Sequence, residues 1–332
     1  MTKARIAVFS SKSYDKDSMN AANSKYGFEL DFYKTQLTAN TAKLVEGYDA
    51  ISCFVNDMVD VDVLSQLDKA NIKMIALRCA GFNNIDLDEA KRRGFVVSRV
   101  PGYSPESVAE HAVAMLLCLN RKLHKAYSRI REHNFNLEGL LGFNLSSKTV
   151  GIIGTGKIGQ ATIRALSGFG CKILCHDPYP NDVVTELGAT YVDLDTLYQQ
   201  SDVISLHCPL TPESNHMINR DAFAKMKSGV MLINTSRGAL VNASDAIEAL
   251  KSGKLGYLGL DVYELEGDLF FRDLSGQVIH DDVFGLLLSY PNVLVTGHQG
   301  YFTDLALDQI AETTLGNIKA YMKGEKTGNE VF

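Results

Sequence analysis

The chain has 332 residues and a mass of 36.4 kDa, more than one hydrophobic core usually accommodates, so its length predicts two domains. Apolar residues make up 45% and charged residues 22%, which excludes a disordered chain, a collagen-like repeat and a coiled coil. The formal net charge is −6 and no basic cluster stands out, so neither nucleic acid nor a membrane surface is an expected partner. A small-molecule substrate or a protein partner remains.

The N-terminal sequence and the spacing of the cysteines indicate the cellular compartment of the protein. The N-terminal residues have no apolar core of the signal-peptide type, and no apolar stretch approaches the roughly 20 residues that span a bilayer. The cysteines show neither CxxC pairs nor zinc-type spacing, so we expect reduced core thiols, no metal site and a cytoplasmic protein. A reactive thiol at Cys79 or Cys208, each at the end of an apolar run, is the alternative. The other cysteines are Cys53, Cys118, Cys171 and Cys175.

Apolar or β-branched runs alternate with polar, helix-like stretches over the first hundred residues, at 5–10, 49–55, 74–79 and 95–100. This alternation predicts βαβ units and therefore a parallel sheet covered by helices. Residues 104–135 begin with Ser-Pro-Glu, carry apolar residues at helical spacing and become basic, which predicts one long helix. Because such a helix can bury an apolar face against a second subunit, we expect a homo-oligomer, a dimer or a tetramer.

The alternation of strands and helices restarts after residue 148. The final segment, 303–326, has the apolar spacing of an amphipathic helix, and we expect this helix to return to the first domain. The apolar runs predict a second doubly wound parallel sheet. These runs span 149–153, 171–176, 202–207, 229–234, 255–261 and 292–297.

A glycine-rich loop follows the first strand of this second region. The sequence TVGIIGTGKIGQ places Gly154, Gly156 and Gly159 in G-x-G-x-x-G register between a strand and a helix. Gly154 permits the tight turn, Gly156 allows a pyrophosphate to approach the backbone, and Gly159 allows close packing of helix on strand. The pattern alone is a weak signal, because glycines also occur in ordinary strand-to-helix turns.

An acidic residue at the end of the next strand strengthens the prediction of a dinucleotide site. Asp177 lies 23 residues after Gly154, where a carboxylate accepts hydrogen bonds from an adenosine ribose. Its charge would repel the 2′-phosphate of NADP, and no Arg or Lys follows in DPYPND, so NAD is favoured. S-adenosylmethionine and FAD use related loops, and an Asp before Pro can simply end a strand.

Three polar side chains follow the later strands, where ligands bind in open parallel sheets. Arg237 follows 229–234, Glu266 follows 255–261, and His298 follows 292–297. Reduction of a 2-keto acid needs a proton donor for the carbonyl oxygen and a cation for the carboxylate. His298 can transfer the proton near neutral pH, Glu266 can orient its ring, and Arg237 can bind the carboxylate or carbonyl. Each of them alone could also be an ordinary surface or structural residue.

Motifs along essentially the whole chain resemble those of the D-isomer-specific 2-hydroxyacid dehydrogenases, especially their fermentative D-lactate-forming members. The resemblance implies that Arg237, Glu266 and His298 are the catalytic residues. It also implies a substrate site at Arg78, Ala80, Gly81 and Tyr103, and cofactor contacts at Val108, Lys157, Ile158, Cys208, Pro209, Thr235, Ser236 and Asp261, in addition to the glycine loop and Asp177. The matching segments are 78–86, 100–112, 134–143, 154–159, 176–180, 202–214, 233–241, 259–266 and 296–299.

The motif order also predicts the domain organisation. We expect an NAD-binding Rossmann domain, residues 101–299, inserted into a flavodoxin-like substrate domain formed by 1–100 and 300–332. The expected activity is NAD-dependent interconversion of pyruvate and D-lactate. Hydroxypyruvate, 2-ketobutyrate or phenylpyruvate as the keto acid is one alternative, and an NAD(H)-sensing, corepressor-like binding protein is another. The arrangement of the insert at 267–282, GDLFFRDLSGQVIHDD, does not follow from its sequence.

Overall fold

The computed structural model describes residues 3–332, which form two compact units, each built on its own parallel sheet. The first unit comprises Met1–Ser104 and Tyr301–Phe332, and the second unit, Pro105–Gly300, is inserted between these two segments of the chain. The chain therefore enters and leaves the second unit only once.

The sheet of the first unit has the strand order β2-β1-β3-β4-β5, and every strand pair in it is parallel. This is the flavodoxin-like order, in which the strand order reverses between β1 and β3. The sequence predicts four of these strands but not β2, an edge strand without a buried residue, whose acidic side chains break the apolar pattern. The strands are β1 (Arg5–Val8), β2 (Glu29–Phe32), β3 (Ala50–Cys53), β4 (Met74–Leu77) and β5 (Val96–Ser98).

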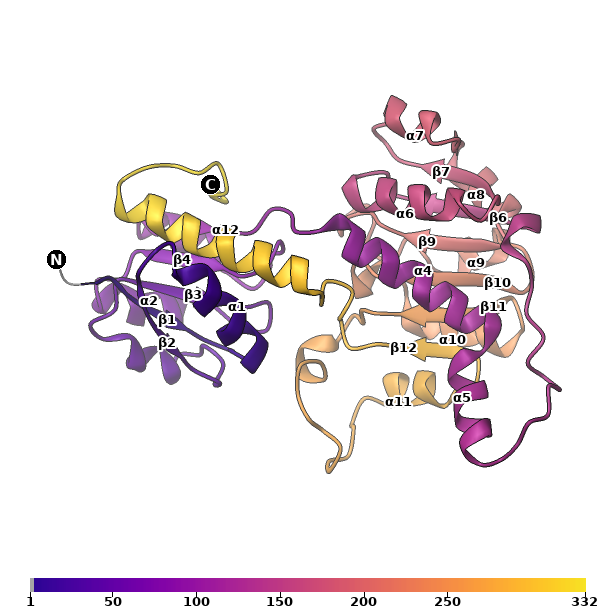
Figure 1. Ribbon diagram of the computed structural model, residues 1–332, viewed down its shortest axis with the longest axis horizontal. Helices are drawn as coiled ribbons and strands as arrows, with labels where there is room; N and C mark the ends of the chain where they lie inside the picture. The colour runs from indigo at the N-terminus through magenta and orange to yellow at the C-terminus, as the bar shows by residue number, and fades with distance from the viewer. Residues whose placement is uncertain (1–2) are drawn as a thin grey trace. The chain divides into compact units, whose positions relative to one another are not determined.

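Helices cover both faces of this first sheet. On one face Leu315 and Ile318 of α12 are fully buried together with Ile6 and Val8 of β1. On the other face Val63 and the rest of the apolar side of α2 pack on the sheet. Helix α12 lies beside α1 (Figure 1), so the predicted return of the last helix to the first unit is confirmed. The helices are α1 (Ser13–Asn23), α2 (Val61–Lys69), α3 (Leu87–Arg92), α12 (Asp304–Met322) and the 3-10 turn η1 (Thr41–Val45).

The sheet of the second unit has the order β12-β11-β10-β9-β6-β7-β8, with all strand pairs parallel. The strand order reverses between β6 and β9, which is the doubly wound pattern of a Rossmann fold. The sequence does not predict β8, which has only two residues at the edge of the sheet. The strands are β6 (Thr149–Ile153), β7 (Lys172–His176), β8 (Thr190–Tyr191), β9 (Val203–Leu206), β10 (Val230–Asn234), β11 (Leu255–Leu260) and β12 (Val293–Val295).

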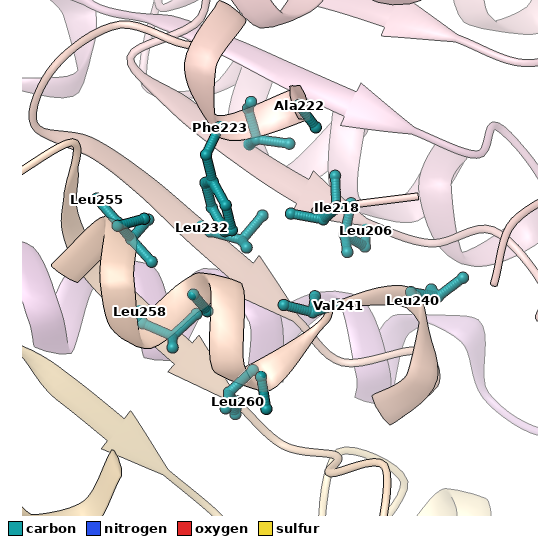
Figure 2. Packing of buried hydrophobic residues seen from close by; sticks show 14 of the residues in the cluster. Leu206, Ile218, Ala222, Phe223, Leu232, Leu240, Val241, Leu255, Leu258 and Leu260 are labelled. Carbon is teal, nitrogen blue, oxygen red and sulfur yellow. The ribbon is translucent and has the colours of Figure 1, made fainter. Parts of the chain in front are cut away.

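Two helical layers cover this second sheet. Figure 2 shows one apolar layer, in which Phe223 of α9 lies over Leu232 of β10, with Leu258 of β11 beside them. On the opposite face α4 and α6 run side by side (Figure 1) over β6 and β10. The helices are α4 (Pro105–Arg121), α5 (Leu123–Arg131), α6 (Lys157–Ser167), α7 (Asp182–Glu186), α8 (Leu194–Gln200), α9 (Arg220–Lys225), α10 (Ala243–Lys251) and α11 (Asp282–Ser289), with the 3-10 turns η2 (Leu145–Ser147), η3 (Gly238–Leu240) and η4 (Glu266–Asp268).

Side-chain caps define where many of these helices begin. A cap oxygen accepts a hydrogen bond from a backbone N–H of the first turn that has no partner within the helix, which stabilises the helix by about 1 kcal/mol. The residues with this role are Asp60, Asp86, Asn181, Asp193, Asn219, Asn242, Asp281 and Thr303.

The prediction of one long helix over 104–135 is wrong. The segment forms α4 and α5, which are interrupted at Lys122, and α5 ends at Arg131. Lys122 has a left-handed backbone with φ of 52°, which ends one helix and starts another. Because Lys is neither Gly nor Pro and favours helices, the local sequence gives no sign of this break.

Candidate functional site

The glycine loop lies directly after β6, the first strand of the second sheet. Gly154 has a φ of +95°, and a Cβ there would lie 2.5 Å from the backbone nitrogen of Cys208. A Cβ on Gly159 would lie 2.1 Å from the carbonyl oxygen of Gly154, so α6 can pack this closely only with glycine at that position. A Cβ on Gly156, in contrast, would meet no atom within 4 Å. Packing within the protein thus requires glycine at positions 154 and 159, whereas Gly156 faces open space.

Asp177 links the end of β7 to this loop. Its Oδ2 accepts a hydrogen bond from the backbone N–H of Thr155 at 2.7 Å, and its Oδ1 accepts one from Tyr179 N–H at 2.8 Å. Each carboxylate oxygen can accept more than one hydrogen bond, so both retain capacity for ribose hydroxyls. The side chain therefore does more than end a strand, because it also fixes the conformation of the glycine loop.

The loop after β9 packs against the glycine loop at Gly154, and the loop after β10 contacts the loop after β9. Ser236 Oγ donates to the carbonyl oxygen of Cys208 at 2.6 Å. Burial raises the pKa of the Cys208 thiol to about 11, so this cysteine is a poor nucleophile at neutral pH. The alternative of a reactive Cys208 is therefore not supported.

These residues fit a bound dinucleotide. The α6 N-terminus, beginning at Lys157, and the open space at Gly156 are suited to a pyrophosphate. At the end of β10, Thr235 Oγ1 is buried and has no hydrogen-bond partner among residues 3–332. Buried polar atoms normally have partners, so this hydroxyl is available to a ligand at the strand end. Val108, on α4, is also buried, and Ile158 and Pro209 flank the loops already described.

Arg237 follows Thr235 and Ser236 at the end of β10. Asn234 holds this turn, since its Nδ2 donates to the Arg237 carbonyl at 2.8 Å and its Oδ1 accepts from Ser236 N–H at 3.1 Å. The guanidinium donates to the Ser236 carbonyl at 2.8 Å, and within the described part of the chain no carboxylate pairs with it. The arrangement leaves a positive charge available to an anion.

His298 and Glu266 form a hydrogen-bonded pair at the ends of β12 and β11. His298 Nδ1 lies 2.7 Å from Glu266 Oε1, and both side chains are about three-quarters buried. The other Glu266 oxygen accepts from Tyr263 N–H at 2.8 Å, so the carboxylate is fixed from two directions. With Nδ1 engaged, Nε2 is the nitrogen free for proton transfer to a ligand. This geometry is that of a general acid/base with an orienting carboxylate.

Asp261 holds the turn that carries His298. Its main-chain oxygen accepts from His298 N–H at 2.7 Å, and its carboxylate accepts from Gln299 and Gly300 N–H groups, both at 2.8 Å. Burial alone would raise the pKa of Asp261, but hydrogen bonds from His111 and Thr296 outweigh it and lower the pKa. The carboxylate is therefore charged and stabilises the left-handed backbone of His298, whose φ is 55°.

His111 on α4 is not among the site residues proposed from the sequence. In the structure its Nε2 lies 3.1 Å from Thr296 Oγ1 and 3.3 Å from Asp261 Oδ1. His111 stands three positions after Val108 on α4, so both face the same side of the helix, and this spacing is the signal that could have identified it. His207 and His216 lie within hydrogen-bond distance of Ser205 Oγ and Glu264 Oε2, respectively, both at 2.9 Å.

The residues expected to bind substrate lie in the first unit. The Arg78 side chain is 1% exposed and donates to the Phe9 carbonyl at 2.8 Å and to Ser52 Oγ at 3.2 Å. Arg78 thus ties together the ends of β1 and β3, and its contact with substrate remains a prediction. Among the described residues no acceptor binds the N–H groups of Ala80 and Gly81, so the turn after β4 offers two adjacent donors.

The structure also shows the surroundings of Tyr103, the state of the cysteines and whether a metal site is present. Tyr103 lies edge-on to Tyr301 with the ring centroids 6.1 Å apart. The cysteines within residues 3–332 are all free thiols, of which Cys53, Cys79 and Cys175 are buried. The part of the chain that the structure describes contains no cluster of side chains able to hold a metal ion, and none of its helices is long and apolar enough to cross a membrane.

Comparison with known proteins shows extensive similarity over the whole chain. The chain is 55% identical to the D-lactate dehydrogenase of Escherichia coli strain K12 over 327 residues, which covers 98% of this chain and 99% of the relative. A solved structure of the pyruvate reductase of Chlamydomonas reinhardtii has 46% identity and a TM-score of 0.95, with 98% of each chain covered. A D-lactate dehydrogenase of Lactobacillus jensenii solved with NAD+ has 34% identity and a TM-score of 0.84, with 99% of each chain covered.

The family model for the second unit agrees with these relatives. Residues 113–300 match the model described as D-isomer specific 2-hydroxyacid dehydrogenase, NAD binding domain. The match covers the glycine loop and the ends of β10, β11 and β12. The chain therefore belongs to the D-isomer specific 2-hydroxyacid dehydrogenases, and its second unit is the NAD-binding domain of that family.

Proposed function

We propose that the chain reduces pyruvate to D-lactate with NADH and also catalyses the reverse reaction. The observation that carries the proposal is the His298–Glu266 pair, with 2.7 Å between Nδ1 and Oε1 at the ends of two adjacent strands. The names of two relatives support the choice of substrate, since one is a D-lactate dehydrogenase and another a pyruvate reductase. When bound, NADH supplies the hydride for the carbonyl carbon.

His298 donates the proton that the reduced carbonyl oxygen requires. Glu266 accepts the Nδ1–H hydrogen bond, which leaves the proton on Nε2 directed to the substrate and stabilises the charged imidazole. In the oxidation of D-lactate the same nitrogen accepts the hydroxyl proton. Because Tyr263 N–H holds Glu266, the pair keeps one geometry through both directions.

Arg237 stabilises the negative charge that develops on the oxygen. Its guanidinium has no carboxylate partner within the described residues, so its charge is not neutralised before substrate binds. The planar fork can bind two oxygens of a keto acid at once. Ser236 and Asn234 set the backbone of this turn and hence the direction of the side chain.

The first unit is the substrate domain of the proposed enzyme. The adjacent N–H groups of Ala80 and Gly81 suit the substrate carboxylate, and Arg78 stabilises the strand ends beside them. Tyr103 and Phe54 both have ring centroids 6.1 Å from the Tyr301 ring, which favours a small substrate side chain. This crowding supports pyruvate over phenylpyruvate.

The second unit binds NAD through the loops at its strand ends. Gly156 and the start of α6 receive the pyrophosphate, Asp177 accepts from the ribose, and Thr235 Oγ1 binds near the nicotinamide end. Asp261 acts chiefly by holding the His298 turn. The other proposed cofactor contacts are Val108, Gly154, Lys157, Ile158, Gly159, Cys208, Pro209 and Ser236.

An exposed apolar surface supports a homo-oligomer. Helix α5 has no buried residue, and three of its apolar side chains, Leu123, Tyr127 and Ile130, are more than half exposed. The following segment, residues 132–144, adds Leu137 at 80% exposure and Leu141 at 88%. Contiguous exposed apolar residues of this kind mark subunit interfaces, so we propose a dimer or a tetramer. The free thiols support a reducing, cytoplasmic location.

A panel of 2-keto acids tests the proposed reaction. NADH oxidation is followed with pyruvate, hydroxypyruvate, 2-ketobutyrate and phenylpyruvate, with NADPH as the alternative cofactor, and the chirality of the product is assigned. We expect pyruvate and NADH to give the highest kcat/KM and D-lactate as the product. A higher kcat/KM with NADPH would contradict the role of Asp177, and higher activity on a longer keto acid would reassign the substrate.

A further inference from the structure

The segment 267–282, which the sequence leaves unexplained, is anchored at both of its ends. At its start Phe270 is 7% exposed and its ring centroid lies 5.9 Å from that of Phe284 in α11. At its end Asp281 accepts a hydrogen bond from Tyr263 Oη at 2.8 Å and caps α11. Tyr263 also donates its backbone N–H to Glu266, so one residue holds both the end of the segment and the catalytic carboxylate.

Phe271 differs from the rest of this segment in where its side chain lies. Residues 272–280 are largely exposed, whereas Phe271 is partly buried. The Phe271 ring lies beside the imidazole of His298, with 5.9 Å between ring centroids and 38° between ring planes. This separation is within the range of favourable aromatic contacts.

The backbone at Phe271 is strained. Its φ is +63°, in the left-handed region that an aromatic residue rarely adopts. Phe270 is buried in the core cluster and Phe271 packs against the edge of that cluster, so the left-handed conformation at Phe271 allows its ring to reach His298 as well. His298 has a φ of +55°, so two residues with unfavourable backbones meet at this contact. Such strain persists where the surrounding structure over-determines it, often at functional sites.

We propose that Phe271 is a positioning residue for His298, an inference that rests on the proposed function. Glu266 holds the imidazole through one hydrogen bond at Nδ1, and a single bond leaves the ring free to swing about it. The Phe271 ring limits that movement and keeps water from one side of the bond, which strengthens it. Nε2 thus stays in the position from which it transfers the proton to substrate.

Replacement of the ring gives the primary test. In Phe271→Ala we expect kcat for pyruvate to fall about tenfold, with KM and the NADH dissociation constant changed less than twofold, because orientation rather than binding is lost. Phe271→Tyr should restore most of kcat, since it returns the ring. Val278→Ala, in the same segment at 77% exposure, is the matched control and should match the unmodified enzyme. An unchanged kcat in Phe271→Ala overturns the inference.

Two further variants separate ring contact from backbone strain and from the proposed function itself. Phe271→Gly removes both the ring and the strain, so a normal kcat would contradict the inference, and a loss equal to that of Phe271→Ala supports it. In the background of His298→Gln, Phe271→Ala should cause no additional loss, and a further tenfold loss would show that Phe271 does not act through His298. Normal turnover of His298→Gln alone would instead refute the role of His298.

Discussion

At the residue scale, the chemistry depends on how three backbone N–H groups are held. His298, Gln299 and Gly300 all donate to Asp261, through its carbonyl and its carboxylate. A Cβ on Gly300 would lie 3.1 Å from Asp261 Oδ2, so glycine keeps this contact close. The buried carboxylate, held charged by its donors, fixes the residue that we propose as the proton donor.

Replacement of His298 should separate catalysis from cofactor binding. We expect His298→Gln to lower kcat by about 10²- to 10⁴-fold, the usual contribution of a general acid. NADH affinity, measured by fluorescence titration, should change little, because the proposed cofactor contacts do not include His298. Near-normal turnover would reject the assignment of the proton donor.

His207 should make the stability of the protein depend on pH. Burial lowers its pKa from the ordinary value to about 4, so the folded protein keeps the ring neutral. Below about pH 6.5 the unfolded chain binds a proton that the folded chain excludes, and stability therefore falls as pH falls toward 4. The contribution amounts to about 3 kcal/mol.

Thermal unfolding at several pH values measures this contribution. In His207→Gln the melting temperature should change less between pH 6.5 and pH 4 than it does in the unmodified protein. His280→Gln replaces an exposed histidine and serves as the control. Equal pH dependence of the His207 variant and the unmodified protein would show that this histidine does not carry the effect.

At the element scale, the glycines of the β6–turn–α6 unit differ in whether the fold or the bound ligand requires them. Gly159→Ala forces a Cβ to 2.1 Å from the Gly154 carbonyl, so it should lower both the melting temperature without ligand and the affinity for NADH. Gly156→Ala meets no protein atom within 4 Å, so stability should be retained. NADH affinity should nevertheless fall about tenfold, because the methyl group occupies the space that we propose for the pyrophosphate.

The two variants are compared by thermal unfolding without ligand and by NADH titration. Loss of stability in Gly156→Ala would mean that this position serves the fold. Unchanged NADH affinity in that variant would mean that no ligand approaches the backbone there.

The sequence predicts most elements but not their exact limits. Buried strands such as β9 and β10 are recognisable because every residue in them is buried and apolar or small. The sequence does not reveal the edge strands β2 and β8 or the break at Lys122, because tertiary contacts rather than the local pattern determine them. The strand-end residues Arg237, Glu266 and His298 can be proposed from topology. Phe271 cannot, since its neighbour His298 is distant in sequence.

At the scale of the whole molecule, the surface of α5 and residues 132–144 should determine oligomeric state. Asn120 binds both the N–H and the carbonyl of Phe143, at 2.8 and 2.9 Å, and so fixes the end of this segment before any partner binds. By gel filtration we expect a species at least twice the 36.4 kDa chain mass. Leu137→Asp should shift it to smaller mass, whereas Val278→Asp, outside this surface, should not. A 36 kDa species for the unmodified protein at micromolar concentration would rule out the oligomer.

Because one unit is inserted into the other, the two units are completed at different times during synthesis on the ribosome. The apolar face of the first sheet is covered by Ala311, Leu315 and Ile318 of α12, which are synthesised after the entire second unit. The second unit is continuous in sequence and can fold during translation. The first unit must wait for α12, with Ile6 and Val8 covered only in part, by Met19 and Ala22 of α1. Pairing residues some three hundred positions apart is entropically slow, so completion of the first unit is expected to be the last step of folding and the one most exposed to aggregation.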